Sequence, residues 1–226
     1  MRALPCLLLA CLPSVVLAQS GFAPDRLAKV SQEVASQIEA GTIPGAVVLV
    51  SRNGQTALFE AQGSCDSGTP MRTDTIFRIY SMTKPVTVVA ALQLVEEGKI
   101  GLDEPVSRYV PELATVAAAS PEARKSGRAM TVRDLMRHTS GLVYGSGTTP
   151  VDLAYRKANV LDRDGTLNDM IGKLATLPLK NAPGTTWEYG VSIDVLGHIV
   201  EVVSGKGLGV YFRERIFEPL GMVDTG

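Results

Sequence analysis

The chain has 226 residues, of which 45% are hydrophobic and 20% are charged. This composition is that of an ordinary globular protein long enough for one good core, and it excludes a largely disordered chain. The formal net charge of −1 excludes a broad positive surface, so we expect no nucleic-acid partner.

The first twenty residues, MRALPCLLLACLPSVVLAQS, have the pattern of a secretory signal peptide. Arg2 precedes an apolar stretch, and Val16-Leu17-Ala18 is a suitable cleavage site, so we expect residues 1–18 to be removed and the protein to be periplasmic or secreted. The stretch is broken by prolines and too short to span a bilayer, so no stable membrane anchor is expected. A lipoprotein site at Cys11 is an alternative. Cleavage after Ala18 leaves Cys65 as the only cysteine, which excludes an internal disulfide.

The next segments predict a helix followed by a hairpin. Residues 25–40 have apolar positions spaced by three and four, as in an amphipathic helix that ends at Gly41. Residues 45–63 are two apolar runs joined through Asn53-Gly54, which is a strong hairpin signal. Residues 75–80, TIFRIY, are expected to be a third short extended piece.

Residues 81–98 predict a buried helix. Nearly every residue from 86 to 95 is apolar, Gly98 is a suitable stop, and Pro85 is tolerated in a first turn that begins near Ser81. The valines leave a strand as the alternative, but the length of the run and the Gly98 stop favour a helix.

The remainder is expected to be a mostly helical region, at about residues 100–222, within one domain that spans residues 19–226 and has no clear linker. Thr131 is expected to cap a short helix that stops at Gly141. In chain order we expect an extended connection at 101–113, helix at 130–142, loop at 145–150, helix at 167–177, a turn-rich loop at 181–189, and helices at 192–205 and 207–222.

Ser81 and Lys84 form a candidate nucleophile–base pair. Residues i and i+3 share a helix face, so the two side chains can touch. The positive first turn and burial are both expected to lower the pKa of Lys84, which would let it accept a proton from the hydroxyl. The alternative is that Ser81 merely caps the helix and Lys84 is solvated.

Other chemistries have weaker support. The sequence contains no Gly-x-Ser-x-Gly motif. His138 and His198 are far apart and lack neighbouring ligands, so we expect no metal and no cofactor. A serine–lysine site also needs a group that protonates the leaving group. Tyr189, on a loop that leads into a helix, is a candidate, with a packing aromatic as the alternative.

Four segments, FRIYSMTKPVT, LDEPVSRYVPEL, TVRDLMRHTSGL and APGTTWEYGVSIDVLGHIVEVVSG, together resemble the serine β-lactamase and penicillin-binding superfamily. They are most similar to its class C β-lactamase-like branch, which includes family VIII carboxylesterases and D-alanyl-D-alanine carboxypeptidases. The resemblance implies that Ser81 is acylated, that Lys84 activates it and that Tyr189 passes a proton to the leaving group. It also implies an α+β fold: an antiparallel sheet flanked by helices, with an all-helical region inserted and the site in the cleft between them.

Two departures from the family pattern affect the expected activity. Class C enzymes have an asparagine two residues after the tyrosine, where this chain has Val191, although Ser192 could partly substitute. The family's third motif, Lys or His followed by a small residue and Gly, has no match after Tyr189, and Asp224-Thr225-Gly226 only looks similar. The late strands and one oxyanion-hole donor are therefore expected to be missing, as in a fragment or a truncated product.

The sequence therefore predicts an exported serine hydrolase that acts on a small-molecule ester or lactam. Small-ester hydrolysis is favoured over β-lactamase or D-alanyl-D-alanine carboxypeptidase activity. A catalytically inactive fragment or binding relative is the alternative from another class. The acyl and leaving groups and the oligomeric state are left open.

Overall fold

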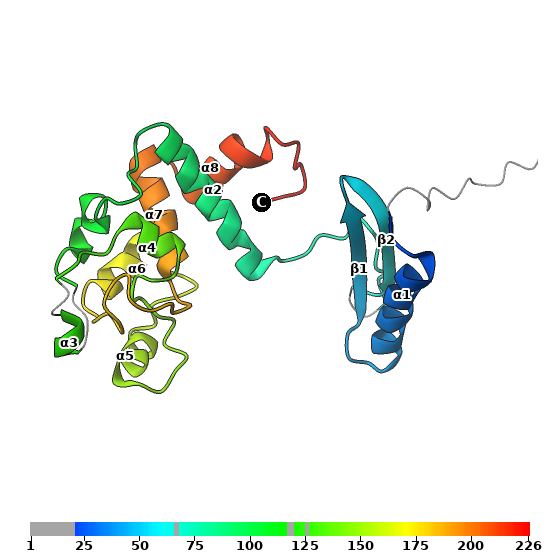
Figure 1. The fold of residues 1–226 in the computed structure, drawn as a ribbon, viewed down its shortest axis with the longest axis horizontal. Coiled ribbons are helices and arrows are strands. Elements are labelled where there is room, and N and C mark those ends of the chain that lie inside the picture. Colours follow the sequence, from blue (N-terminus) through cyan, green and yellow to red (C-terminus); the bar gives the residue numbers. More distant parts are fainter. Residues whose placement is uncertain (1–20, 66–67, 117–119, 125–126) are drawn as a thin grey trace, which may run out of the picture. The chain divides into compact units, whose positions relative to one another are not determined.

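The computed structural model describes residues 21–65, 68–116, 120–124 and 127–226 (Figure 1). The expected signal peptide, residues 1–18, lies outside the described residues. The chain forms two compact units, with the boundary between Arg78 and Ile79. We call them the hairpin unit and the helical unit and describe each by itself.

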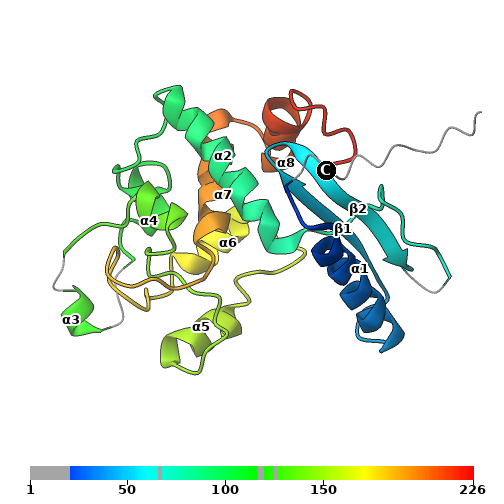
Figure 2. The same cartoon turned by 45° about the vertical axis from the view of Figure 1, so that its right-hand side comes forward.

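The hairpin unit consists of one helix on a two-stranded antiparallel sheet. Helix α1 (Pro24–Glu39) lies along one face of strands β1 (Gly45–Arg52) and β2 (Gln55–Gly63), as Figure 2 shows. Asn53 and Gly54 have φ of 52° and 74°, the left-handed pair that a type I′ turn requires. The predicted helix and hairpin are confirmed.

Within the hairpin unit, the sheet face opposite α1 has apolar side chains that are not covered. Leu49 and Phe59 lie directly opposite each other in the β1–β2 register and are 60% and 52% exposed. On the α1 side, the Gln62 side chain donates a hydrogen bond to the Ser31 carbonyl. Of the predicted extended piece at 75–80, residues 75–79 form neither helix nor strand and pair with neither β1 nor β2, and Tyr80 begins a helical turn.

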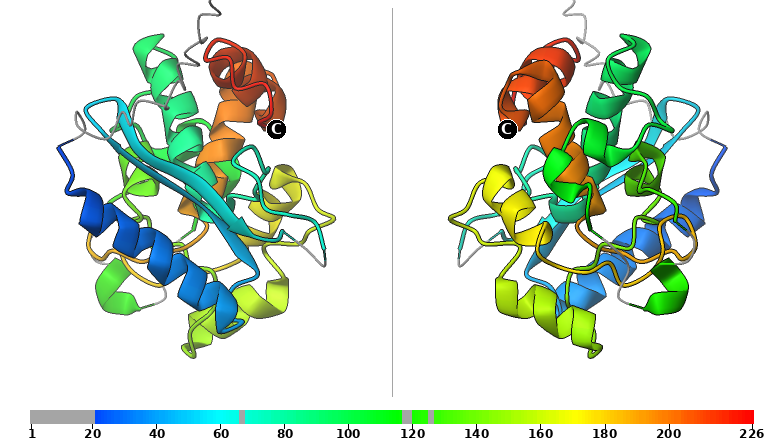
Figure 3. Two further views of the ribbon diagram at one scale, coloured as in Figure 1. Left: turned by 90° about the vertical axis from the view of Figure 1, so that its right-hand side faces the viewer. Right: turned by 90° about the vertical axis from the view of Figure 1, so that its left-hand side faces the viewer.

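The helical unit is built around α7 (Ser192–Ser204), whose apolar residues Val195, Leu196, Ile199 and Val200 are fully buried. Helices α2, α4, α6 and α8 pack around it, and both views of Figure 3 show α2 beside α7. In chain order the unit contains η2 (Tyr80–Met82), α2 (Thr83–Glu96), η3 (Val106–Arg108), η4 (Pro111–Leu113), α3 (Pro121–Arg124), α4 (Val132–Met136), α5 (Pro150–Ala158), α6 (Leu167–Leu174), α7, α8 (Leu208–Phe212) and the π-helical turn η5 (Arg213–Phe217).

Helix α2 begins at Thr83, close to Ser81 as predicted, but within the helical unit it is not buried on all sides. Ala90, Ala91 and Leu94 face the core, whereas Val89 and Leu92 are 45% and 39% exposed. Because the sequence of α2 is apolar on nearly all sides, it does not indicate which side packs against α7. The exposure of Val89 and Leu92 could therefore not be predicted.

Three helices of this unit start with the same Thr-x-x-Asp capping box. Each threonine accepts the N–H of the aspartate three residues on, and the aspartate carboxylate accepts the threonine N–H in return. The pairs are Thr131–Asp134 at α4, Thr149–Asp152 at α5 and Thr166–Asp169 at α6. The predicted Thr131 cap is confirmed.

The predicted end of the helix that begins after Thr131 is wrong. Helix α4 ends before His138, which adopts a left-handed conformation with φ of 55°, three residues ahead of Gly141. Helix α5 was not predicted at all. It is short and amphipathic, and it begins at Pro150, which in the sequence looks like the end of a loop.

Within the described residues, no single helix is long and apolar enough to cross a membrane. Helix α7 and the segment Leu208–Phe217 are long and apolar enough only when they are taken together, and the two are bent by 78° relative to each other.

Candidate active site

Ser81 and Lys84 lie at the start of α2 and are in contact. Ser81 belongs to the η2 turn ahead of the helix, and Lys84 lies in the first helical turn. The Lys84 ammonium donates a hydrogen bond of 3.1 Å to Ser81 Oγ. The preceding residue, Tyr80, has φ of 44°, a left-handed conformation that is uncommon for a non-glycine residue.

Tyr189 reaches the same oxygen from a distant part of the sequence. Its hydroxyl donates a hydrogen bond of 2.8 Å to Ser81 Oγ, although the two residues are 108 positions apart. The contact exists because α2 and α7 pack together and the loop that carries Tyr189 leads into α7. The structure therefore brings together the three residues that the sequence singled out.

The direction of the Lys84 pKa shift differs from the prediction. Burial lowers the pKa of Lys84, but its hydrogen bonds to the hydroxyls of Tyr189 and Tyr144 outweigh burial and leave the pKa above its usual value. The pKa of Tyr189 is lowered by its hydrogen bond to Ser81 and then by Lys84. The partly buried cation is thus stabilised by two phenol oxygens, of which the sequence singled out only that of Tyr189.

Aromatic rings enclose Lys84 and Tyr189. The Lys84 Nζ lies 4.9 Å from the centroid of the Tyr189 ring and 5.7 Å from that of Tyr144. The rings of Trp187 and His138 lie 6.2 Å and 4.8 Å from the Tyr189 ring. Sequence reasoning missed Tyr144, Trp187 and any role of His138. Trp187 precedes Tyr189 by two residues, but no local signal marks Tyr144.

Asp194 is a mostly buried carboxyl in the first turn of α7. Burial raises its pKa, and the charge of Lys84 acts in the opposite direction. Its Oδ2 atom is buried and makes no hydrogen bond within the described structure. A negative charge at this place would strengthen the preference for a protonated Lys84.

Ser192 does not face a substrate. It is completely buried, and its hydroxyl is hydrogen-bonded to that of Ser140 at 2.8 Å. Val191 is also completely buried. The expectation that Ser192 could stand in for the lactam-binding asparagine is wrong, because its hydroxyl is used to hold the start of α7 to the loop after α4.

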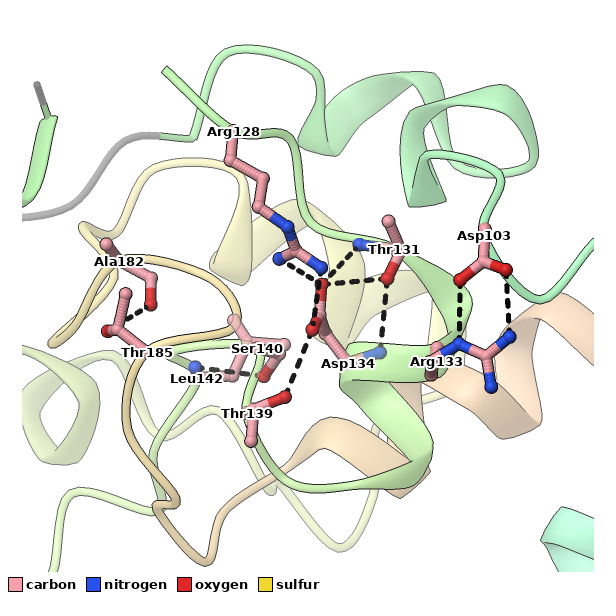
Figure 4. A network of polar contacts seen from close by, with 10 residues as sticks. All are labelled: Asp103, Arg128, Thr131, Arg133, Asp134, Thr139, Ser140, Leu142, Ala182 and Thr185. Atoms are coloured by element: carbon pink, nitrogen blue, oxygen red, sulfur yellow. Dashed lines mark hydrogen bonds and ion pairs between the residues drawn. The ribbon is translucent and has the colours of Figure 1, made fainter. Parts of the chain in front are cut away.

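A polar network fixes the loop after α4 (Figure 4). The Asp134 carboxylate is buried and contacts both terminal nitrogens of Arg128, at 2.7 and 3.2 Å. It also accepts hydrogen bonds from the N–H and hydroxyl of Thr131 and from the hydroxyl of Thr139. One carboxylate therefore links the start of α4, at Thr131, to Thr139, the residue directly after His138.

In the part of the chain that the structure describes, the geometry does not support a metal site that includes a histidine. No three His, Cys, Asp or Glu residues there are grouped so that they could hold a metal ion. His198 is buried within α7.

Residues 30–226 match the family model described as beta-lactamase. The chain is 38% identical to esterase EstB of Burkholderia gladioli over 192 residues, covering 80% of this chain and 46% of EstB. Its structure is similar to that of EstCE1, a hydrolase with promiscuous acyltransferase activity (TM-score 0.75, 34% identity, 87% of this chain and 52% of EstCE1). It is also similar to an octameric penicillin-binding protein homologue from Pyrococcus abyssi (TM-score 0.66, 25% identity, 87% and 43% of the two chains).

These similarities confirm the predicted α+β fold, that of β-lactamases and transpeptidases. The chain spans about half the length of the proteins it matches.

Proposed function

We propose, from the premise that this chain belongs to the beta-lactamase family, that the protein is a serine hydrolase that cleaves a small carboxylic ester through a covalent acyl-enzyme on Ser81. The observation that supports the proposal best is the convergence at one oxygen. Ser81 Oγ lies 3.1 Å from Lys84 Nζ and 2.8 Å from the Tyr189 hydroxyl. A hydroxyl between two proton-handling groups, exposed at the start of a helix, is the arrangement that an activated nucleophile requires.

In the first step, Ser81 Oγ attacks the ester carbonyl carbon while its proton passes to the phenolate form of Tyr189. The carbonyl π electrons move to the oxygen and give a tetrahedral intermediate. When this collapses, the bond to the alcohol oxygen breaks, and Tyr189 returns the proton to the departing alcohol. Water then repeats the sequence on the acyl-enzyme, which releases the carboxylic acid and restores the Ser81 hydroxyl.

The directions of two pKa shifts support these roles. A lowered pKa makes the Tyr189 hydroxyl the easier group to ionise, and a raised pKa keeps Lys84 as an ammonium ion. Lys84 then stabilises the phenolate and the developing serine alkoxide through charge. This reverses the expectation that Lys84 is the base.

The residues directly after Tyr189 favour ester cleavage over lactam cleavage. Val191 and Ser192 are buried, so neither presents an amide or hydroxyl to the side chain of a lactam. The esterase name of EstB agrees with this choice. β-Lactamase or D-alanyl-D-alanine carboxypeptidase activity and an inactive binding relative are the competing proposals.

We also propose that the protein is exported, because residues 1–18 have the pattern of a signal peptide. N-terminal sequencing of protein recovered from the periplasm or the medium is expected to begin at Gln19. An intact Met1 on the recovered protein would contradict the proposal.

The nucleophile is tested by labelling the natural-length protein with a fluorophosphonate and mapping the adduct by mass spectrometry. We expect the label on Ser81 and its loss in Ser81→Ala. The matched control is Ser51→Ala, which changes an exposed serine of β1. Labelling that survives Ser81→Ala would contradict the assignment.

Substrate class is tested by comparing kcat/KM for short-chain nitrophenyl esters and for a chromogenic cephalosporin. We expect the esters to be hydrolysed faster. If the ratio is inverted, the β-lactamase proposal replaces the esterase proposal.

A further inference from the structure

The loop that carries Tyr189 is attached to the end of α4 through main-chain hydrogen bonds. The Gly184 N–H donates to the Thr139 carbonyl at 2.7 Å, and the Glu188 N–H donates to the His138 carbonyl at 2.8 Å. Two residues further on, the Gly190 N–H points to His138 Nδ1 at 3.5 Å. His138 therefore contacts the residues on both sides of Tyr189.

The His138 ring also lies against the Tyr189 ring. Their centroids are 4.8 Å apart, and the Trp187 ring lies 6.3 Å from that of His138. On the other side, a Cβ at Gly190 would lie 2.4 Å from the Leu142 carbonyl oxygen, so the chain after Tyr189 is pressed against that backbone. His138 therefore borders one side of the Tyr189 ring, which is otherwise 40% exposed.

His138 itself is held firmly. Its left-handed conformation ends α4, and the buried Asp134 carboxylate fixes the segments before and after it through Thr131 and Thr139. A side chain on such an anchored turn can transmit that rigidity to a neighbouring loop.

We propose that His138 is the positioning residue for Tyr189: its carbonyl and its neutral imidazole hold the loop so that the Tyr189 hydroxyl stays in contact with Ser81. This inference rests on the proposed function of Ser81 and Tyr189. It gives His138 no contact with the substrate.

The proposal requires a particular protonation state of the imidazole. Because Nδ1 accepts from Gly190, the proton of the neutral ring lies on Nε2. A second proton would place an N–H at Nδ1 against the Gly190 N–H, and two donors cannot bond. Burial and the charge of Lys84 on α2 both lower the pKa of His138, which keeps the ring neutral at physiological pH. From the loop, the Tyr189 ring lies against the imidazole, and the Glu188 carboxylate of the same loop is paired with Lys180.

Two substitutions separate the effect of the hydrogen-bond acceptor Nδ1 from the effect of the rest of the His138 side chain. His138→Gly tolerates the left-handed backbone but removes both ring and acceptor. His138→Asn also tolerates that conformation and places an amide oxygen close to the position of Nδ1, without a titratable group. We expect His138→Gly to lower kcat by roughly 10- to 100-fold with little change in KM, the scale of a misplaced catalytic group. His138→Asn should restore most of the lost rate.

The pH profile gives a readout that a merely structural role would not change. In the wild type, the slope of log kcat/KM against pH should steepen by one unit below the pKa of His138, which lies below its ordinary value of about 6.5. His138→Asn should remove this steepening. The same substitution at the other histidine, His198→Asn, is the matched control and should leave the profile as it is.

The fluorescence of Trp187, the single tryptophan of this sequence, provides a test that needs no activity. An imidazolium quenches a nearby indole, so the difference signal between wild type and Trp187→Phe should show an acid inflection that is absent in His138→Asn. If Ser81 is not labelled in the wild type but this inflection is present, the proposed function fails and the contact of His138 with the Tyr189 loop stands.

The positioning proposal is overturned if His138→Gly folds with a normal melting temperature and keeps its kcat. It is also overturned if the steepening persists in His138→Asn, or if that variant is as slow as His138→Gly.

Discussion

Ser81 Oγ receives a hydrogen bond from both Lys84 and Tyr189, so the two groups act on one proton path. We predict that Lys84→Ala and Tyr189→Phe each lower kcat/KM by about 10²-fold or more, the usual scale for a positioned acid or base. The double variant should lose much less than the product of the two effects. Steady-state kinetics on nitrophenyl esters checks this.

Tyr144→Phe is the matched control for Tyr189→Phe. Tyr144 borders Lys84 through its ring and hydroxyl, so its loss should have a smaller effect than the loss of Tyr189. Full activity in Tyr189→Phe would show that this tyrosine is a packing residue.

The opposite pKa shifts of Tyr189 and Lys84 predict a bell-shaped profile of kcat/KM. The proposed mechanism requires the Tyr189 phenolate, so activity should rise with pH through a pKa below the usual value of about 10. It should fall again where Lys84 loses its proton, above the usual lysine value of about 10.4. Tyr189→Phe should lack the rising limb between neutral pH and pH 10. If wild type and Tyr189→Phe have the same profile, the phenolate mechanism is wrong.

At the scale of elements, Asp134 joins α4 to the segments before and after it. Asp134→Asn should destabilise the helical unit by about 2–4 kcal/mol, because a buried carboxylate that accepts several hydrogen bonds loses its charge-assisted partners. Denaturant unfolding of both proteins measures the difference. The control is Asp103→Asn, whose exposed pair with Arg133 should contribute little.

The stability that the Asp134 carboxylate contributes should decrease at acidic pH. Burial raises the pKa of Asp134, but the hydrogen bonds from Arg128 and Thr131 outweigh it and leave the pKa below its usual value. The stabilisation is therefore complete above the unfolded pKa of about 3.9 and is lost as pH falls through the lower folded value. In Asp134→Asn, this part of the acid dependence should be absent. An unchanged acid dependence would show that Asp134 is not the group responsible.

The elements that could be predicted are those with a local cause. Asn53-Gly54 fixes a turn by itself, and Gly205 ends α7 with a left-handed residue as expected. The stop at His138 was not predicted because the sequence points to Gly141, a residue that adopts a left-handed conformation more readily than histidine does. Helix α5 was missed because its single apolar stripe is short and comes directly after a loop.

The candidate site could be predicted only in part, because only some of its contacts have a local cause in the sequence. Ser81 and Lys84 are three residues apart, and a shared helix face brings them together whatever the rest of the chain does. The choice of Tyr189 depended on the resemblance to a family. Tyr144 and the role of His138 depend on how α4 and the loop after it pack against α7, and the sequence contains no local trace of that packing. The wrong direction for the Lys84 pKa came from leaving out its hydrogen bonds to the phenols of Tyr189 and Tyr144, which together outweigh burial.

At the scale of the whole molecule, each of the two units taken by itself has exposed apolar side chains. We predict that residues 19–226 expressed alone bind ANS and unfold without a cooperative transition. Leu49 and Phe59 form an exposed apolar pair on a two-stranded sheet, which is marginal in water, and α2 exposes Val89 and Leu92. Dye binding and thermal melting of the purified segment test this. In the double variant Leu49→Thr, Phe59→Thr, dye binding should decrease. A monomer that melts cooperatively and does not bind ANS would contradict the prediction.

The left-handed conformation of Tyr80, next to Ser81, affects how the stability and the activity of this protein can change under selection. A left-handed conformation costs an ordinary residue about 1–2 kcal/mol, and glycine or asparagine avoids much of that cost. Selection for heat resistance alone should therefore enrich Tyr80→Gly and Tyr80→Asn. The same changes loosen the turn that presents the nucleophile, so the most heat-resistant descendants are expected to be among the slower catalysts.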